Sequence, residues 1–236
     1  MTLMRMAFTK MLKKEAKEIT GGLSAPSKMP GPSFNLPAAA CITGAKLVKV
    51  KGSTCSGCYA LKGRYRFPNV QAALQRRLAK LHSPRWVEAM VTLIDNDPVM
   101  RWHDSGDIQS AKHLTNIFEV CNRTPDTMHW LPTREARFIK LLDPDVVPKN
   151  LKIVLSDHMN DQETPPTWWP YTSGVETDHK ETHCPAFRTD EAGNVYRLDQ
   201  FQAFTKKEKQ KLDLGHCGNC RNCWNRSTKR VIYGKH

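Results

Sequence analysis

The sequence has no apolar run long enough to cross a membrane. Hydrophobic residues make up 39% of its 236 residues, but no stretch of them approaches the roughly 18 residues that a spanning helix needs. The apolar block of a secretory signal is also missing, because Arg5, Lys10, Lys13 and Lys14 interrupt the first residues. We therefore expect no membrane partner, a cytoplasmic location and, in that reducing compartment, no disulfides.

Negative charge is scarce as well. Thirty-six Lys and Arg residues stand against 23 Asp and Glu, which gives a formal net charge of +13. A surplus of this size suits a polyanion such as DNA or RNA, although many basic proteins simply have solvated surfaces. No RGG tract or basic zipper accompanies the charge. Nucleic acid is therefore one candidate partner, another protein is the second, and the oligomeric state is left open.

Helical and strand-like patterns alternate through the middle of the chain. Apolar residues recur at helical spacing over residues 70–81, 87–94 and 114–121. Short β-like runs cover residues 99–103, 128–131 and 151–155. Strands separated by helices pair in parallel, so the sequence predicts an α/β fold, either a partial parallel barrel or an open parallel sheet, with a small irregular cysteine-rich C-terminal region.

The chain divides into three parts on these patterns. Residues 21–37 are rich in Pro and Gly and predict an arm without a helix. We expect a basic leader and arm (1–37), an α/β domain with the first cysteines (38–175) and a C-terminal cluster-binding region (176–236).

Polar residues follow each predicted strand, where the chemistry of parallel α/β sheets gathers. They form the clusters His-Asp-Ser-Gly-Asp (103–107), Thr-Arg-Glu (133–135) and Ser-Asp-His (156–158). Each cluster alone is equally well explained as a helix cap, with Asp107 or Ser110 capping the helix that follows. The coincidence of three favours a site.

Seven of the eight cysteines fall into two spaced sets. The C-terminal cysteine set comprises Cys184, Cys217, Cys220 and Cys223. The last three have C-x2-C-x2-C spacing, the spacing with which a bacterial ferredoxin loop holds an iron–sulfur cluster. Cys184, which a proline follows as it does the remote cysteine of that ferredoxin pattern, is the expected fourth ligand. A structural zinc is the alternative, but zinc normally uses two separated C-x2-C pairs. We therefore predict a four-iron, four-sulfur (4Fe-4S) cluster at this set.

The N-terminal cysteine set comprises Cys41, Cys55 and Cys58, with no local fourth cysteine. A 4Fe-4S cluster with three protein ligands keeps one iron open, as a catalytic zinc keeps one position open. A zinc ion completed by a histidine is the alternative. The eighth cysteine, Cys121, lies in an apolar helical stripe and is predicted to be a buried structural thiol.

This layout resembles the radical S-adenosylmethionine proteins, which carry a three-cysteine 4Fe-4S cluster after the first strand of a partial α/β barrel. Ser105-Gly106-Asp107 stands where that family's Gly- and acid-containing motif would fall. The resemblance implies that the open iron chelates S-adenosylmethionine, that Asp107 holds its amino group and that Arg134 holds its carboxylate. The spacing differs, since the family's C-x3-C-x2-C loop is replaced by a first gap of 13 residues.

A second resemblance spans most of the chain. The run Cys55-Ser-Gly-Cys58-Tyr-Ala, followed by Arg101-Trp-His-Asp-Ser-Gly-Asp107, resembles the gene product 88 family of bacteriophage proteins, from about Phe34 to Trp224. It implies a location in the cytoplasm of the host cell and adds a host protein to the candidate partners.

Two functional interpretations follow. The first is an iron–sulfur protein with one or two 4Fe-4S clusters and radical S-adenosylmethionine-like activity. The alternative is a non-catalytic protein, stapled by iron–sulfur or zinc sites, that binds a host protein or nucleic acid, in the latter case with the loop aromatics Trp168, Trp169 and Tyr171. The candidate catalytic residues are Asp107, Arg134 and His103, and the candidate cofactor-binding residues are Ser105, Gly106, Asp107, Arg134 and Asp157.

Overall fold

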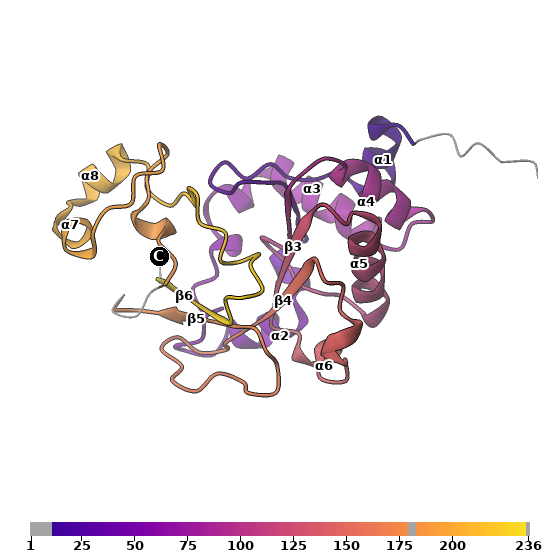
Figure 1. Cartoon of the computed structure of the whole chain (residues 1–236). Coiled ribbons are helices and arrows are strands. Elements are labelled where there is room, and N and C mark those ends of the chain that lie inside the picture. Colours follow the sequence, from indigo (N-terminus) through magenta and orange to yellow (C-terminus); the bar gives the residue numbers. More distant parts are fainter. Residues whose placement is uncertain (1–10, 179–182, 235–236) are drawn as a thin grey trace, which may run out of the picture.

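A six-stranded, all-parallel sheet forms the centre of the computed structural model, which describes residues 11–178 and 183–234. Each strand pairs with the next one along the chain, and within the described residues the sheet stays open rather than closing into a barrel (Figure 1). The α/β prediction is therefore confirmed. The strands are β1 (Ser33–Phe34), β2 (Val99–Trp102), β3 (Met128–Thr133), β4 (Leu151–Ser156), β5 (Thr172–Glu176) and β6 (Arg230–Gly234).

The helices gather mainly at two places. Most helices from the first half of the chain lie on one side of the strands, the last two lie with the C-terminal region on the other, and the helices at residues 42–47 and 136–139 lie at the lower ends of the strands (Figure 1). The described helices are α1 (Lys13–Thr20), α2 (Ile42–Leu47), α3 (Pro68–Ala79), α4 (Trp86–Ile94), α5 (Ala111–Arg123), α6 (Ala136–Ile139), α7 (Leu198–Ala203) and α8 (Lys206–Lys211).

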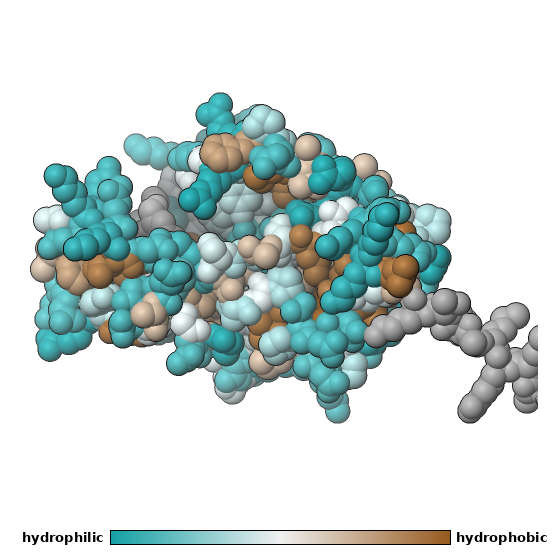
Figure 2. Space-filling model, turned by 90° about the horizontal axis from the view of Figure 1, so that it is seen from above, coloured by the Kyte–Doolittle hydropathy of each residue, from teal (hydrophilic) through white to brown (hydrophobic). Residues whose placement is uncertain are grey.

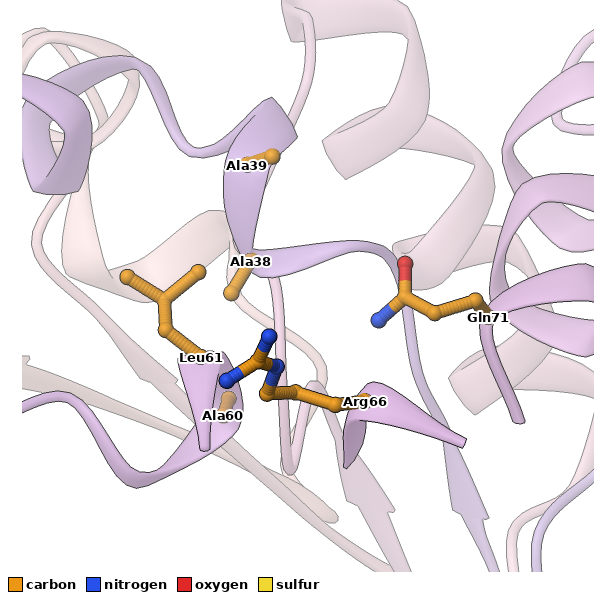
Figure 3. A pocket seen from close by; sticks show the side chains of 6 residues that line it. All are labelled: Ala38, Ala39, Ala60, Leu61, Arg66 and Gln71. Atoms are coloured by element: carbon orange, nitrogen blue, oxygen red, sulfur yellow. The ribbon is translucent and has the colours of Figure 1, made fainter. Parts of the chain in front are cut away.

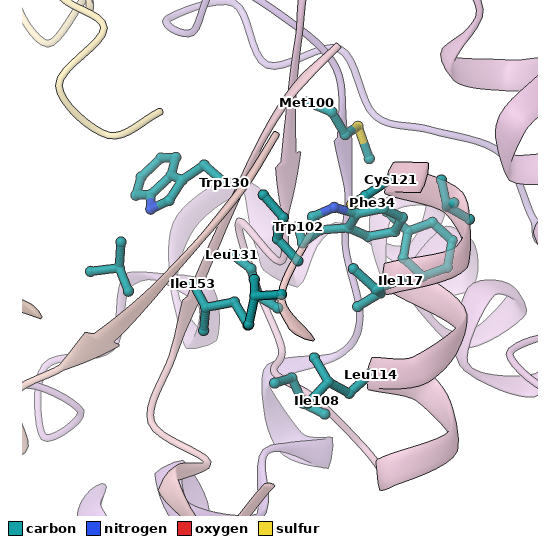
Figure 4. Close-up of a cluster of buried hydrophobic side chains, with 14 of the residues drawn as sticks. Phe34, Met100, Trp102, Ile108, Leu114, Ile117, Cys121, Trp130, Leu131 and Ile153 are labelled. Carbon is teal, nitrogen blue, oxygen red and sulfur yellow. The ribbon is translucent and has the colours of Figure 1, made fainter. Parts of the chain in front are cut away.

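The core lies between the sheet and helices α4 and α5, and we call this side of the sheet its helical face. Phe34 packs edge-on against Trp86 of α4, with ring centroids 5.5 Å apart, and Trp102 lies beside both rings. Cys121 of α5 is fully buried in the same cluster (Figure 4). The prediction of a buried structural thiol there is confirmed.

The opposite side, the inner face, carries a row of unusual side chains. Arg101, Trp130 and Lys152 are neighbours in the strand register, and alternation along each strand places them on the side away from Met100 and Trp102. We call these three residues the inner row. Two of them are cations in the middle of a sheet, so something polar must cover this face.

The covering element is the segment of the C-terminal cysteine set. Trp224 lies 5.2 Å from the ring of Trp130 and donates a 2.9 Å hydrogen bond from Nε1 to the carbonyl of Met100. Lys152 Nζ donates to the carbonyl of Asn222 at 2.7 Å. These contacts pack the cysteine-rich segment directly onto the sheet.

The sheet joins all three parts into which the sequence divides. β1 lies in the expected arm, where Phe34 and Leu36 are fully buried, and β6 lies in the C-terminal region. Of the loop aromatics, Trp169 and Tyr171 belong to the core, and Trp168 is 45% exposed.

The outer surface is mostly hydrophilic. Figure 2 shows hydrophilic residues over most of one face, with hydrophobic ones in small separate patches. Among the helices of residues 11–178 and 183–234, none combines the length and the apolarity that crossing a bilayer requires.

Candidate functional site

The three thiols of the N-terminal cysteine set meet beside α2. A Cβ placed on Gly44 would lie 3.6 Å from Cys41 Sγ and 3.8 Å from Cys55 Sγ, so both sulfurs face the same small space. Burial, with Asp107 and the other two thiols close by, raises the pKa of Cys41 to about 12. Burial also raises the pKa of Cys55, while the guanidinium of Arg134 opposes that rise. The thiols of Cys41 and Cys55 are therefore protonated at neutral pH until a bound cation displaces the protons.

Glu135 fixes the chain directly after Cys41. Its Oε1 accepts hydrogen bonds from the backbone N–H groups of Ile42 at 3.1 Å and Thr43 at 2.7 Å, and its Oε2 accepts one from the Thr43 hydroxyl at 2.9 Å. The carboxylate is fully buried. It holds the start of α2, and with it the position of Cys41.

Ser105 and Gly106 dock on the segment that leads to Cys41. The Ser105 hydroxyl donates to the carbonyl of Leu36 at 2.8 Å, and Leu36 N–H donates back to the carbonyl of Ser105 at 2.9 Å. Gly106 has a φ of +80°, and a Cβ there would lie 2.5 Å from Leu36 Cβ. Only glycine allows this approach, so both residues support the N-terminal cysteine set through Leu36.

Asp107 is buried at the carboxyl ends of β2 and β3. Its Oδ1 accepts hydrogen bonds from the Thr133 hydroxyl at 2.6 Å and Ile108 N–H at 2.7 Å, and its Oδ2 accepts one from Arg134 N–H at 2.9 Å. Burial, which these hydrogen bonds only partly offset, raises the pKa of Asp107 to about 6. The helix cap is instead Ser110, whose side chain accepts from His113 N–H.

Arg134 and Asp157 meet at the same edge of the sheet but differ in what their side chains contact. Arg134 Nε donates to the carbonyl of Asp157 at 3.2 Å, and its guanidinium acts on Cys55. The Asp157 carboxylate is engaged by Arg230, at 2.6 Å from Oδ2. Arg134 therefore faces the cysteines, and Asp157 holds Arg134 through its carbonyl and Arg230 through its carboxylate.

His103 points away from the cysteines. A φ of +63° breaks the strand alternation and turns its ring toward His113 of α5, with centroids 5.1 Å apart. Both ring nitrogens are buried and have no hydrogen-bond partner among the described residues. Burial, with His113 and Arg101 nearby, holds the pKa of His103 well below its ordinary value. The structure thus brings Asp107 and Arg134 to the cysteines and leaves His103 in the core.

The C-terminal cysteine set is brought together over the inner face. Burial, opposed by a hydrogen bond from the backbone of Ala186 and reinforced by the other three thiols, raises the pKa of Cys184 to about 12. Burial also raises the pKa of Cys223 to about 11, while the Tyr233 hydroxyl, 3.2 Å from its sulfur, and Arg101 oppose that rise. The remote Cys184 thus lies with the three others, as its expected role requires.

Two buried cations border this set. The charge of Arg101 opposes the rise in the pKa values of Cys217 and Cys223, and Lys152 interacts electrostatically with Cys223. Burial lowers the pKa of Lys152 to about 8, while Cys223 opposes the shift. Within the described residues the ammonium has no carboxylate partner. Positive charge therefore faces the thiols from the sheet.

Arg101 also links the two cysteine sets. Its guanidinium forms a 2.9 Å ion pair with Asp104. The Tyr59 hydroxyl donates to the carbonyl of Asp104, and Tyr59 directly follows Cys58. A short polar chain therefore runs from Cys58 to Cys223.

The donor sets fit iron–sulfur clusters by their chemistry. All seven sulfurs are free thiols, and they gather as three and four on buried, cation-lined surfaces. In the part of the chain that the structure describes, however, no three His, Cys, Asp or Glu side chains are arranged to hold a single metal ion. Tetrahedral zinc needs sulfurs about 2.3 Å from one centre, whereas a cluster spreads its ligands over several irons.

The comparisons with known proteins identify the family. A family model described as Gene product 88 matches residues 3–226. The chain belongs to this family. Neither a curated protein nor a solved structure matches it. The resemblance to the bacteriophage family, noted from the run at Cys55–Cys58, is therefore confirmed, whereas the likeness to radical S-adenosylmethionine proteins stays an expectation.

A cavity of about 270 Å³ opens beside the N-terminal cysteine set of this gene product 88 protein. Ala38 and Ala39 come just before Cys41, and Ala60 and Leu61 come just after Cys58. Figure 3 shows the Arg66 guanidinium among Leu61, Ala60 and Ala38, with the Gln71 amide on the other side of the cavity. Its lining thus comes from the segments on either side of the set and includes none of the three cysteines.

Sequence analysis missed Glu135, Arg101 and Lys152 as parts of the site. Lys152 had a signal, because it is the one charge in the apolar run Leu-Lys-Ile-Val-Leu. Glu135 was noted beside Arg134 without a role. Arg101 had no such signal, since the face it occupies depends on the strand register.

Proposed function

We propose that the protein binds two 4Fe-4S clusters, a fully ligated one at the C-terminal cysteine set and one with an open iron at the N-terminal cysteine set. The observation that carries the proposal is the gathering of four thiols beside Arg101 and Lys152 on the inner face. Four thiolates around a cluster carry net negative charge, which is costly to bury unless cations accompany it. The inner row supplies two.

The N-terminal site suits a ligand with an amine and a carboxylate. Asp107 Oδ2 accepts one hydrogen bond, from Arg134 N–H, so it has capacity for an ammonium. Arg134 donates through Nε to a carbonyl, and its terminal N–H groups can take a carboxylate in a bidentate contact. An open-site cluster supplies one-electron chemistry to a bound S-adenosylmethionine. Within this proposal, Asp107 orients the amino group of that ligand and Arg134 its carboxylate.

Metal analysis tests the clusters. Iron, acid-labile sulfide and zinc are measured in protein purified without oxygen, beside a Cys55→Ala, Cys58→Ala variant and a Cys121→Ala control that removes a thiol outside both sets. We expect about eight irons per chain, about four in the double variant and about eight in the control. Four irons that are unchanged in the double variant would refute the N-terminal cluster. Stoichiometric zinc without sulfide would refute both clusters and favour the metal-stapled, non-catalytic alternative.

Electron paramagnetic resonance tests the ligand. S-adenosylmethionine added to the reduced protein should change the spectrum of the open-site cluster, and Arg134→Ala should weaken that response while iron content stays constant. An unchanged spectrum at saturating ligand would refute the assignment of the open iron.

A further inference from the structure

A second cavity lies between α1 and α3, and none of the cysteines lines it. It has a volume of about 540 Å³. One acidic residue, Glu18, lines it. Its five basic lining residues are Lys14 and Lys17 of α1 and Arg76, Arg77 and Lys80 at the end of α3.

The positive charge in this cavity is not compensated. Within residues 11–178 and 183–234, none of the five cations forms an ion pair. The neighbouring Glu15 of α1 is already paired with Arg85 at 2.8 Å. Five cations that share one concave surface with a single carboxylate, that of Glu18, produce a positive local potential.

Arg77 is a buried cation in this cavity. It is only 5% exposed, and its Nε donates to the carbonyl of Gly22 at 2.7 Å. Lys80 similarly donates to the carbonyl of Glu18. These carbonyls, at and just after the end of α1, accept hydrogen bonds from the side chains of Arg77 and Lys80, but they leave the net charge in place. Burial, with Arg76 beside it, lowers the pKa of Arg77 to about 10, so the guanidinium stays charged at neutral pH in surroundings that favour an anion.

Capping of α1 explains only part of the cavity. Arg77 and Lys80 contact α1 carbonyls, whereas the exposed side chains of Lys14, Lys17 and Arg76 make no such contact among the described hydrogen bonds. The cavity also lacks an aromatic lining residue on which a base would stack. Its chemistry is therefore that of a backbone-phosphate site rather than a base-reading one.

We propose that the cavity between α1 and α3 binds the phosphodiester backbone of a nucleic acid without sequence preference. Two neighbouring helices present their cations to one strand of phosphates, and Arg77 forms the floor of the site. The lining of this cavity shares no residue with either cysteine set.

Binding of a fluorescent duplex DNA, measured by anisotropy between about 50 and 200 mM salt, tests the proposal. The variant Lys14→Gln, Lys17→Gln, Arg76→Gln changes three exposed residues and leaves Arg77 in place. The control, Lys206→Gln, Lys207→Gln, Lys211→Gln, removes the same charge from exposed positions of α8. Single-stranded DNA, single-stranded RNA and inorganic tripolyphosphate are compared as competitors.

We expect the cavity variant to reduce the slope of log affinity against log salt by up to about 2.7 for duplex DNA, or about 0.9 for each lost phosphate contact. The α8 control should keep nearly the full slope. Equal losses in both variants would overturn the proposal, because net charge alone would then explain binding. Absence of salt-dependent binding, or competition by tripolyphosphate as strong as that by the polymers, would also overturn it.

Discussion

Replacing His129 with asparagine should remove part of the protein's sensitivity to acid. The imidazole is fully buried, and its Nδ1 accepts a 3.2 Å hydrogen bond from Trp102 Nε1. Its Nε2 lies 2.9 Å from Thr124 Oγ1, whose hydroxyl donates to the carbonyl of Val120. The Nε2 proton therefore points to Thr124, as this network requires. A second proton on Nδ1 would face the Trp102 N–H, so the ring is held neutral.

The size of the effect follows from the pKa of His129. Burial lowers it from 6.5 to about 3. The unfolded chain therefore takes up a proton as the pH falls below 6.5, while the native state does not until about pH 3. The contribution of the neutral His129 to the free energy of unfolding is therefore fully present above about pH 6.5 and is lost as the pH falls toward 3. Between about pH 7 and 5, this one imidazole accounts for a loss of about 2 kcal/mol.

Urea unfolding followed by tryptophan fluorescence at both pH values measures this loss. In His129→Asn, the free energy of unfolding should fall by about 2 kcal/mol less than in the wild type over the same interval. Effects common to both proteins cancel in this difference. The control Ile117→Val, which costs about 0.5–1.5 kcal/mol in the same core, should keep the full acid loss. Equal acid loss in His129→Asn and the wild type would refute the reasoning.

Three further substitutions probe the supports of the site. Gly106→Ala combines a positive φ with a severe clash and should lower the free energy of unfolding in urea by more than about 2 kcal/mol. Its control, Gly57→Ala, adds a Cβ with nothing within 4 Å and should leave the stability nearly unchanged. Equal losses of stability in the two variants would contradict the packing argument. Trp224→Phe removes the donor to a β2 carbonyl and should lower the unfolding free energy by about 1–3 kcal/mol; unchanged stability would show that the hydrogen bond contributes nothing. Glu135→Gln weakens three hydrogen bonds at the N-terminal cysteine set, so iron should be lost faster to a chelator, and release at the wild-type rate would rule out its positioning role.

The helices and strands that the sequence predicted are those with a clear apolar periodicity in their own residues. β2, β3 and β4 and helices α3, α4 and α5 lie where hydrophobic periodicity placed them. Residues 135–142, whose pattern also predicts a helix, form only the short helix Ala136–Ile139. β5 and β6 contain Gly, Thr and charged residues, and they are strands because they extend a sheet already formed. α1 is mostly charged and is stabilised by packing of Ala16 against α4.

For the site, too, local sequence patterns predicted some features, and others depend on the fold. The proline after Cys184 led to its grouping with the C-terminal triad, and in the structure the Cys184 thiol lies close enough to those three thiols to be affected by them; its role as a ligand stays a prediction. Which side chains border the thiols depends on register and burial, so Arg101 and Glu135 emerged only from the structure. His103 shows the reverse, since its place after a strand suggested chemistry but its backbone conformation turns it into the core.

The sequential strand order also governs how the molecule is made. Each new strand finds its partner in the strand synthesised just before it, so the sheet can grow in the order in which the chain emerges. Residues 217–224, which cover the inner row, follow β1 to β5 in the chain. Until then Arg101, Trp130 and Lys152 lie open to solvent on the growing sheet. A chain truncated before Cys217 would therefore lack both β6 and the segment that covers this cationic, aromatic surface.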